Sequence, residues 1–137
     1  MKIDKKLIIL LVLYTLIFLP SLFEPISYGD ECIYLTLGNA ARQGLVFYKD
    51  IHDNKPPLLY LIAAASFNRL FYLRLISLSW NLIHLAIVYE LIQKLVRKKL
   101  LPFLGGLIFI ALYLIFEGRV ANGENFMMMP ISLAVLL

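Results

Sequence analysis

Long runs of apolar residues without a single charged side chain dominate the pattern of this chain. They cover residues 7–23, 75–89, 100–116 and 126–137, and the apolar pattern of the second run continues to Val96. A helix that crosses the hydrocarbon core of a bilayer needs about 20 mostly apolar residues, with a range of roughly 17–25. The pattern therefore predicts membrane-spanning helices over residues 7–23, 74–96 and 100–116, and the start of a fourth over residues 126–137.

The polar stretch between the first two runs holds two shorter helical patterns. Asp30 is a candidate N-cap, and apolar residues follow it at helical spacing. Gly44 is typical of the end of a helix, so we expect a helix over residues 30–43. The double proline at residues 56–57 suits the first turn of a further helix, which we expect over residues 56–72.

The charge distribution bears on topology. The chain is 61% hydrophobic, against about 45–50% in soluble domains. Its net charge of +4 comes from lysines and arginines that cluster beside the apolar runs, so it does not indicate a nucleic-acid partner. Lys2, Lys5 and Lys6 precede the first run, and Arg97, Lys98 and Lys99 precede the third. Under the positive-inside rule both clusters face the cytoplasm.

The chain must then cross the membrane an odd number of times between these clusters. The weaker of two apolar candidates, residues 57–68, is 12 residues long and is followed closely by Arg69 and Arg74. A run of about 10–14 residues is more often interfacial than spanning. We therefore expect residues 56–72 to lie along the outer membrane surface and residues 74–96 to cross.

In this topology two polar loops, residues 24–54 and 117–125, face the same outer side and can meet. The expected fold class is an all-α polytopic membrane protein with extracytoplasmic juxtamembrane helices in its first outer loop. It belongs in the plasma membrane with a cytoplasmic N-terminus. A helix that stopped at Leu137 inside lipid would leave its last carbonyls unpaired. We therefore expect residues 1–137 to be the N-terminal part of a single transmembrane domain, inactive alone.

Asp30 and Glu31 are adjacent acids in the first outer loop. Helix capping and the helix dipole explain an acidic pair at this place without any chemistry. A carboxylate at the membrane face can also serve as a base or a metal ligand, because desolvation makes a carboxylate a better proton acceptor. The residues alone leave both interpretations open.

Lys55 follows Asp53 and precedes the double proline. It can be part of a rigid turn that places its amine at the interface, or a fixed ammonium that binds a lipid phosphate at headgroup level. Arg119 and Glu124 belong to the second outer loop. That loop can simply start the next helix, or Glu124 can face Asp30 across a site.

The order of these segments resembles the start of polytopic membrane glycosyltransferases of the GT-C type. More narrowly, it is similar to bacterial and archaeal relatives of the protein O-mannosyltransferases (dolichyl-phosphate-mannose-protein mannosyltransferases) and of the lipid A aminoarabinose transferase. The segments that carry the resemblance are Asp30-Glu31, Tyr48-Lys49-Asp50, Asp53-Asn54-Lys55-Pro56-Pro57-Leu58-Leu59-Tyr60 and Asn122-Gly123-Glu124-Asn125-Phe126-Met127.

The resemblance implies transfer of a sugar from a polyprenyl-phosphate donor to an acceptor hydroxyl on a lipid, glycan or protein at the extracytoplasmic face. Asp30 would act as the base and Glu31 would support it. Glu124 would form the opposite acidic wall, and Lys55 would neutralise the leaving phosphate. The resemblance further implies substrate-binding roles for the remaining candidates, Tyr48, Asp53 and Arg119.

Two questions stay open at this point. Some relatives bind a divalent metal, for which Asp30 and Glu124 are the candidate ligands here. The alternative function is that of a non-catalytic transporter, flippase or accessory membrane subunit. Such a protein places polar groups inside the membrane along a pathway, whereas most acids of this chain lie in the outer loops.

Overall fold

The computed structural model describes residues 4–25, 28–96, 98–116 and 118–137, and these residues form helices joined by loops. The only β-type pairing within them is an isolated bridge between Phe47 and Ile51. The prediction of an all-helical chain is therefore confirmed for the described residues. In chain order the elements are α1 (Lys5–Phe18), the 3₁₀ helix η1 (Leu19–Phe23), α2 (Gly29–Arg42), α3 (Pro57–Ala64), α4 (Leu70–Leu95), α5 (Leu101–Ile115) and α6 (Gly123–Leu136).

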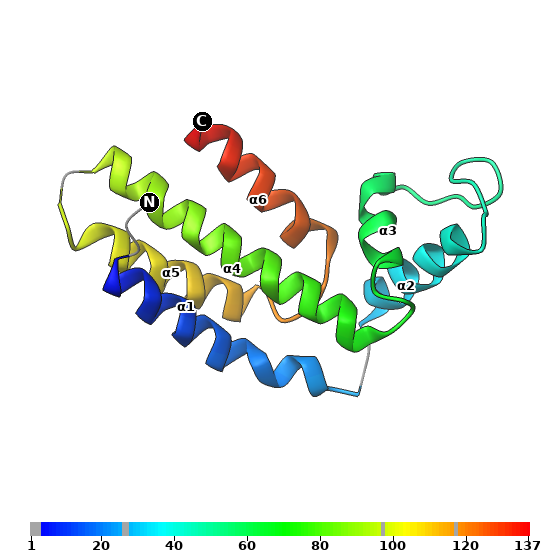
Figure 1. Cartoon of the computed structure of the whole chain (residues 1–137), viewed down its shortest axis with the longest axis horizontal. Helices are drawn as coiled ribbons and strands as arrows, with labels where there is room; N and C mark the ends of the chain where they lie inside the picture. Colours follow the sequence, from blue (N-terminus) through cyan, green and yellow to red (C-terminus); the bar gives the residue numbers. More distant parts are fainter. Residues whose placement is uncertain (1–3, 26–27, 97, 117) are drawn as a thin grey trace.

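Four helices form a bundle, and two others form a lobe at one end of it (Figure 1). In the bundle α4 packs against α1, α5 and α6, while in the lobe α2 packs against α3. The bundle core is made of apolar and aromatic side chains from α1, η1, α4 and α5. Its buried members are Leu7, Leu10, Tyr14, Phe18, Leu22, Leu78, Leu85, Tyr89, Phe109 and Ile110.

Two helical segments are long and apolar enough to cross a membrane, by length and composition. They are Lys5–Phe23, which joins α1 to η1, and Leu70–Leu95, which is α4. The apolar helices α5 and α6 are shorter. Pro20 lies at the point where α1 gives way to the 3₁₀ turn, because proline has no N–H to continue the α-helical hydrogen bonding.

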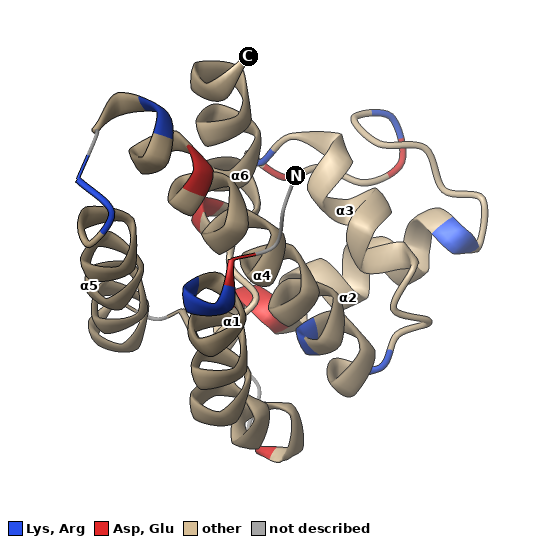
Figure 2. Cartoon of the chain, turned by 60° about the vertical axis from the view of Figure 1, so that its left-hand side comes forward, with Lys and Arg blue, Asp and Glu red and all other residues tan. Residues whose placement is uncertain are grey.

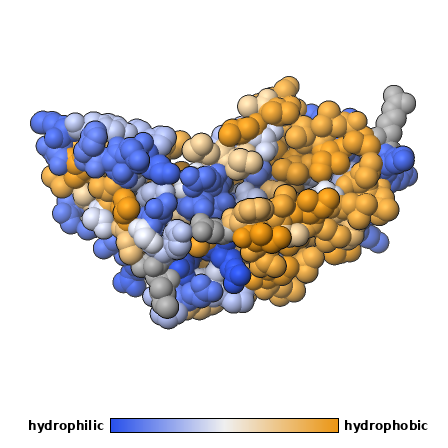
Figure 3. Space-filling view, turned by 180° about the vertical axis from the view of Figure 1, so that it is seen from behind, coloured by the Kyte–Doolittle hydropathy of each residue, from blue (hydrophilic) through white to orange (hydrophobic). Residues whose placement is uncertain are grey.

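On the face seen in Figure 3, the surface of the bundle is largely apolar and that of the lobe is largely polar. Figure 3 shows hydrophobic atoms over the bundle and hydrophilic atoms over the α2–α3 side. Large apolar side chains stand exposed on several bundle helices, among them Ile9 and Leu16 on α1, Ile108 on α5 and Val135 on α6. Extensive exposed apolar surface indicates contact with another protein or with lipid.

The start of α1 and the connection between α4 and α5 lie at the same end of the bundle, away from the lobe (Figures 1 and 2). The Lys6 amine donates a hydrogen bond to the Lys99 carbonyl at 2.9 Å. The expectation that the two basic clusters share one side agrees with this contact. Lys2, Arg97 and Glu117, which entered the sequence argument, lie outside the described residues.

The segment predicted as one surface helix over residues 56–72 is instead a short helix followed by a turn. α3 ends at Ala64, and Phe67 and Asn68 then adopt φ of +55° and +59°. A side chain in this left-handed region strains the backbone, so the helix cannot run through these residues. α4 begins at Leu70, four residues before the predicted start of the second span.

α2 begins one residue before its predicted start, and Asp30 is not its N-cap. Tyr28 holds the cap position, and its backbone N–H donates to the Glu31 carboxylate at 3.0 Å. Asp30 and Glu31 lie in the first turn, where the helix dipole favours negative charge. At the other end Gln43 is the C-cap and Gly44 has φ +89°, as expected for a glycine that ends a helix.

Gly38 allows α2 and α3 to approach closely. A Cβ at this position would lie 2.6 Å from the backbone nitrogen of Ala64 and 2.8 Å from the carbonyl carbon of Ala63. We expect Gly38→Ala to force the two helices apart and to destabilise the purified protein by about 1–3 kcal/mol, visible as a lower melting temperature. Gly29→Ala is the control, because a Cβ there meets nothing within 4 Å. Equal effects of the two substitutions would contradict the close packing.

Candidate functional site

Polar residues from α2, from the loop before α3 and from the start of α6 meet where the lobe joins the bundle. The Lys55 Nζ lies 3.4 Å from the Glu124 Oε1, and the Tyr34 hydroxyl donates to the Asp30 Oδ2 at 3.2 Å. A Cβ on Gly123 would lie 3.4 Å from the Tyr34 hydroxyl and 3.7 Å from the Lys55 Nζ. We call Asp30, Tyr34, Lys55 and Glu124 the polar rim. The two loops that were expected to meet do so here.

The loop around Lys55 is held by its own side chains. The Tyr48 hydroxyl donates to the Lys55 carbonyl at 2.9 Å. The Tyr60 hydroxyl donates to the Asp53 carboxylate, and this hydrogen bond lowers the pKa of Asp53. Tyr48 has φ +65°, a strained conformation that persists only where surrounding contacts hold it. In this arrangement Tyr48 holds the backbone of Lys55, and the Asp53 carboxylate is engaged by Tyr60, whereas the resemblance implied substrate-binding roles for both.

The start of α6 places Glu124 at the rim. The Asn122 side chain caps the helix by accepting a hydrogen bond from the Asn125 N–H at 3.0 Å. The Asn125 side chain in turn donates to the Val120 carbonyl at 2.8 Å. Glu124 lies in the first turn, where the partial positive charge of the helix N-terminus stabilises its carboxylate. This agrees with the expectation that the second polar loop starts the last helix.

Glu31 lies inside the protein rather than at the rim. Arg74 of α4 donates two hydrogen bonds to its carboxylate, from Nε at 2.9 Å and from Nη2 at 2.8 Å. The backbone N–H groups of Tyr28 and Ala121 donate to the same carboxylate at 3.0 and 3.1 Å. The Arg74 Nη1 also donates to the Ser21 carbonyl at 2.7 Å. The pair thus joins the start of α2, the end of η1, α4 and the loop before α6.

This environment changes the role expected for Glu31. Burial by itself raises the pKa of the carboxyl, but the hydrogen bonds from Arg74, Tyr28 and Ala121 outweigh burial and the pKa lies below its ordinary value. The side chain is 0% exposed. Sequence reasoning counted Glu31 among the catalytic residues, yet it has no accessible atom with which to touch a substrate. Its role in this structure is to position the residues beside it.

Tyr34 and Arg74 were not predicted from the sequence as residues of the site. Tyr34 lies four residues after Asp30 in α2, a spacing at which helical side chains are neighbours. Its hydroxyl has a raised pKa, because it is desolvated and lies beside the Asp30 carboxylate. An arginine close to an apolar span is itself a signal of a buried partner. No local pattern, however, shows that the partner of Arg74 is Glu31, 43 residues earlier.

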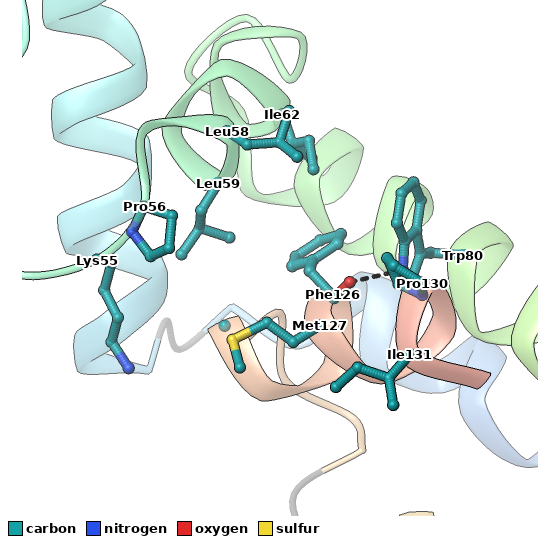
Figure 4. Close-up of a pocket in the computed structure, with 11 residues that line it drawn as sticks. Lys55, Pro56, Leu58, Leu59, Ile62, Trp80, Phe126, Met127, Pro130 and Ile131 are labelled. Carbon is teal, nitrogen blue, oxygen red and sulfur yellow. Dashed lines mark hydrogen bonds between the residues drawn. The ribbon is translucent and has the colours of Figure 1, made fainter. Parts of the chain in front are cut away.

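A mostly apolar cavity of about 360 Å³ opens beside Lys55 (Figure 4). It lies between α3, α4 and α6, and Lys55 is its only charged lining residue among those that the structure describes. Trp80 at the far side donates its indole N–H to the Phe126 carbonyl at 3.2 Å. The lining residues are Lys55, Pro56, Leu58, Leu59, Ile62, Trp80, Gly123, Phe126, Met127, Pro130 and Ile131.

The described residues of the rim do not form a ready-made site for a divalent cation. The described residues contain no group of three or more His, Cys, Asp or Glu side chains that could hold a metal. Asp30 and Glu124 supply carboxylates, but the Lys55 ammonium already lies on Glu124 and the Tyr34 hydroxyl donates to Asp30. A Mg²⁺ ion can be held by one or two carboxylates together with water and substrate phosphates, so a metal here would compete with Lys55 and Tyr34 for these two carboxylates. Arg119, the remaining candidate, is exposed in the loop before α6 and does not line the cavity.

A second group of polar side chains lies within the bundle. His84 of α4 is buried, and its ring nitrogens form hydrogen bonds with the Tyr113 hydroxyl at 2.9 Å and the Ser132 hydroxyl at 2.8 Å. These bonds join α4 to α5 and α6. His84 therefore serves as an interhelical link, which is a common role for a polar side chain within an apolar helix.

No family model, curated protein or solved structure matches this chain. The function of the site is therefore argued from its own geometry. A cation at the mouth of an apolar cavity is complementary to a ligand with a phosphate and a hydrocarbon chain. Asp30, a partly buried residue, adds a carboxylate proton acceptor on the same rim.

Proposed function

We propose that the chain takes part in the transfer of a sugar from a polyprenyl-phosphate donor to an acceptor hydroxyl at the outer face of the cell membrane. The observation that carries this proposal is the apolar cavity that Lys55 lines, with Glu124 paired to this lysine and Asp30 joined to the same rim through Tyr34. The cavity suits the first isoprene units of the donor. The lysine suits its phosphate, because a fixed ammonium pairs with phosphate oxygens.

The distribution of charge and apolar surface supports a membrane setting for this site. The apolar bundle would lie in the bilayer, and the polar α2–α3 lobe would lie at its outer surface (Figure 3). The lysines at the opposite end, Lys5, Lys6, Lys98 and Lys99, would then face the cytoplasm, in agreement with the positive-inside rule. In this orientation the cavity opens at the depth where a lipid-linked phosphate lies.

The proposed reaction exchanges one bond of the anomeric carbon for another. The acceptor oxygen bonds to this carbon from the face opposite the phosphate, and the bond between the carbon and the phosphate oxygen breaks. Asp30 takes the proton of the acceptor hydroxyl, so that the products are the glycoside and polyprenyl phosphate. Lys55 stabilises the negative charge that develops on the leaving phosphate. This geometry inverts the configuration of the sugar.

The neighbours of these two residues prepare them for their roles. The Tyr34 hydroxyl binds the Asp30 Oδ2, which orients the carboxylate and leaves its other oxygen for the acceptor. Glu124 pairs with Lys55 at 3.4 Å and is itself exposed, so a phosphate can share the ammonium with it. Glu31 and Arg74 fix the start of α2, on which Asp30 lies.

Filling the cavity tests the lipid part of the proposal. We expect Ile62→Trp to reduce labelling of the reconstituted protein by a photoreactive polyprenyl phosphate at least about 10-fold, since a bulky side chain there occupies the space for the isoprene chain. Leu61→Trp is the matched control, because Leu61 is exposed on α3 and does not line the cavity. Unlabelled polyprenyl phosphate should compete for wild-type labelling, and the polyprenol without phosphate should compete poorly. Equal labelling of the two tryptophan variants would show that the isoprene chain does not bind in this cavity.

Transport of a lipid or solute is the second candidate function. Polar groups inside a membrane bundle often mark a pathway. A cavity of about 320 Å³ reaches from His84 to Glu124 and gives this candidate its structural basis. Both ring nitrogens of His84 are nevertheless satisfied by Tyr113 and Ser132, which favours a structural link. Flux across reconstituted vesicles without sugar transfer would favour transport.

A further inference from the structure

A basic pocket lies at the end of the bundle opposite the polar rim. Its volume is about 470 Å³, and it lies between the start of α1, the end of α4 and the connection to α5. The lining residues are Asp4, Lys6, Gln93, Val96, Lys98 and Lys99. Figure 2 shows the basic segments at the start of α1 and before α5 that contribute these lysines.

The pocket retains positive charge after its internal contacts are counted. Both carboxylate oxygens of Asp4 are engaged, one by the Tyr89 hydroxyl at 2.7 Å and one by the Lys6 backbone N–H at 3.2 Å. The Lys6 ammonium has three N–H groups and uses one of them on the Lys99 carbonyl. The lysines outnumber the single acid of the lining by three to one. The arrangement therefore offers several donors to an anion.

Apolar side chains adjoin the charged lining residues of the pocket along the chain. Leu95 and Leu100, which flank the connection between α4 and α5, are 73% and 56% exposed. Val96 itself lines the pocket. A ligand bound here would thus meet cations at its head and exposed hydrocarbon beside it, which is the chemistry of a phospholipid rather than of a free anion.

We infer that this pocket binds the phosphate group of an anionic phospholipid in the leaflet at this end of the bundle. In the orientation given above this is the cytoplasmic leaflet, whose anionic lipids attract basic segments close to membrane spans. Lys6 would hold the phosphate from α1, and Lys98 and Lys99 would hold it from the α4–α5 connection. The lipid would then tie α1 to the α4–α5 pair. This site is separate from the donor cavity and does not depend on sugar transfer.

Native mass spectrometry of the detergent-purified protein with added lipid tests this inference. We expect phosphatidylglycerol to bind more tightly than phosphatidylcholine. The double variant Lys98→Gln/Lys99→Gln should lose this preference by about 5-fold for each lysine removed. The control is Lys5→Gln/Lys94→Gln, which removes the same charge near the same end from residues that do not line the pocket. The control should retain the preference.

Three results would overturn the inference. The first is equal affinity of the wild-type protein for the two lipids. The second is an equal loss in both double variants, because that would indicate diffuse attraction rather than a site. The third is displacement of phosphatidylglycerol by low-millimolar inorganic phosphate, which would assign the pocket to a soluble anion. None of these measurements involves the donor cavity. If the lipid inference is wrong, the proposed transfer reaction is therefore unaffected.

Discussion

Replacing Arg74 with methionine is expected to lower the free energy of unfolding by about 3–5 kcal/mol. The side chains of Arg74 and Glu31 are 3% and 0% exposed, and their closest atoms lie 2.8 Å apart. Without the guanidinium, the carboxylate of Glu31 stays buried with only backbone donors, and desolvation of that charge is then poorly compensated. The Ser21 carbonyl also loses its partner. Denaturation of the detergent-purified protein, followed by circular dichroism, measures the effect.

The matched comparison is Glu124→Gln, which breaks the other ion pair of the described residues. Lys55 and Glu124 are 33% and 66% exposed in their side chains, so their pairing should contribute less than about 1 kcal/mol. If Arg74→Met destabilises no more than Glu124→Gln, the buried pair is not the link that we describe.

The same pair should make stability depend on acid pH. The pKa of Glu31 in the folded protein lies below its ordinary value of 4.5. The stabilisation is therefore fully present above pH 4.5 and is lost as the pH falls below this value through the folded pKa. Melting temperatures measured from pH 7 to pH 3 should show this loss in the wild type. The Glu31→Gln variant should lack that component, and an unchanged profile would contradict the assignment.

Asp30→Asn is expected to reduce sugar transfer about 10²–10⁴-fold, the range typical for loss of a general base. Asparagine keeps the shape of the side chain and can accept the hydrogen bond from Tyr34, but it cannot take a proton at neutral pH. Binding of polyprenyl phosphate should therefore be retained. The measurement is transfer of labelled sugar from a polyprenyl-phosphate donor, in membranes of cells that express the full-length protein that carries these residues.

Asp50→Asn provides the control for the loss of one acid from the same loop region. The Asp50 Oδ2 accepts a hydrogen bond from the Val46 N–H, which an asparagine oxygen can also accept. This variant should retain transfer. If Asp30→Asn retains transfer as well, Asp30 is not the base. If it loses lipid binding together with transfer, its role is in binding instead.

The elements of this fold follow largely from local sequence signals. The apolar runs anticipate α1, α4, α5 and α6, and Gly44 and the double proline at residues 56–57 lie where α2 ends and α3 begins. The main error concerns residues 56–72, because Phe67 and Asn68 adopt left-handed backbone conformations that an apolar pattern does not reveal. Both residues are exposed, and the Arg42 guanidinium carbon lies 4.6 Å from the centre of the Phe67 ring, a contact between residues distant in sequence that no local pattern predicts.

Some residues of the candidate site could be predicted from the sequence, and the cavity beside them could not. Asp30, Lys55 and Glu124 were selected from motifs, and all lie on one rim, because the segments that carry them lie at the same end of the bundle. The apolar cavity was not anticipated, since it is formed by side chains from three helices distant in sequence.

The sequence by itself determined the helical segments, the placement of the N-terminal and α4–α5 basic clusters at one end, and the return of both acidic loops to the other. These properties depend on hydrophobic periodicity and charge, which are local. Only the tertiary structure decided the different positions of Asp30 and Glu31. Successive residues of an α-helix point about 100° apart, so one of two adjacent acids can face the interior while the other faces the rim. The rotation of α2 about its axis places Glu31 in the interior and Asp30 at the rim. Hydrogen bonds from Arg74 and from the Ala121 N–H to Glu31 hold the helix in this orientation.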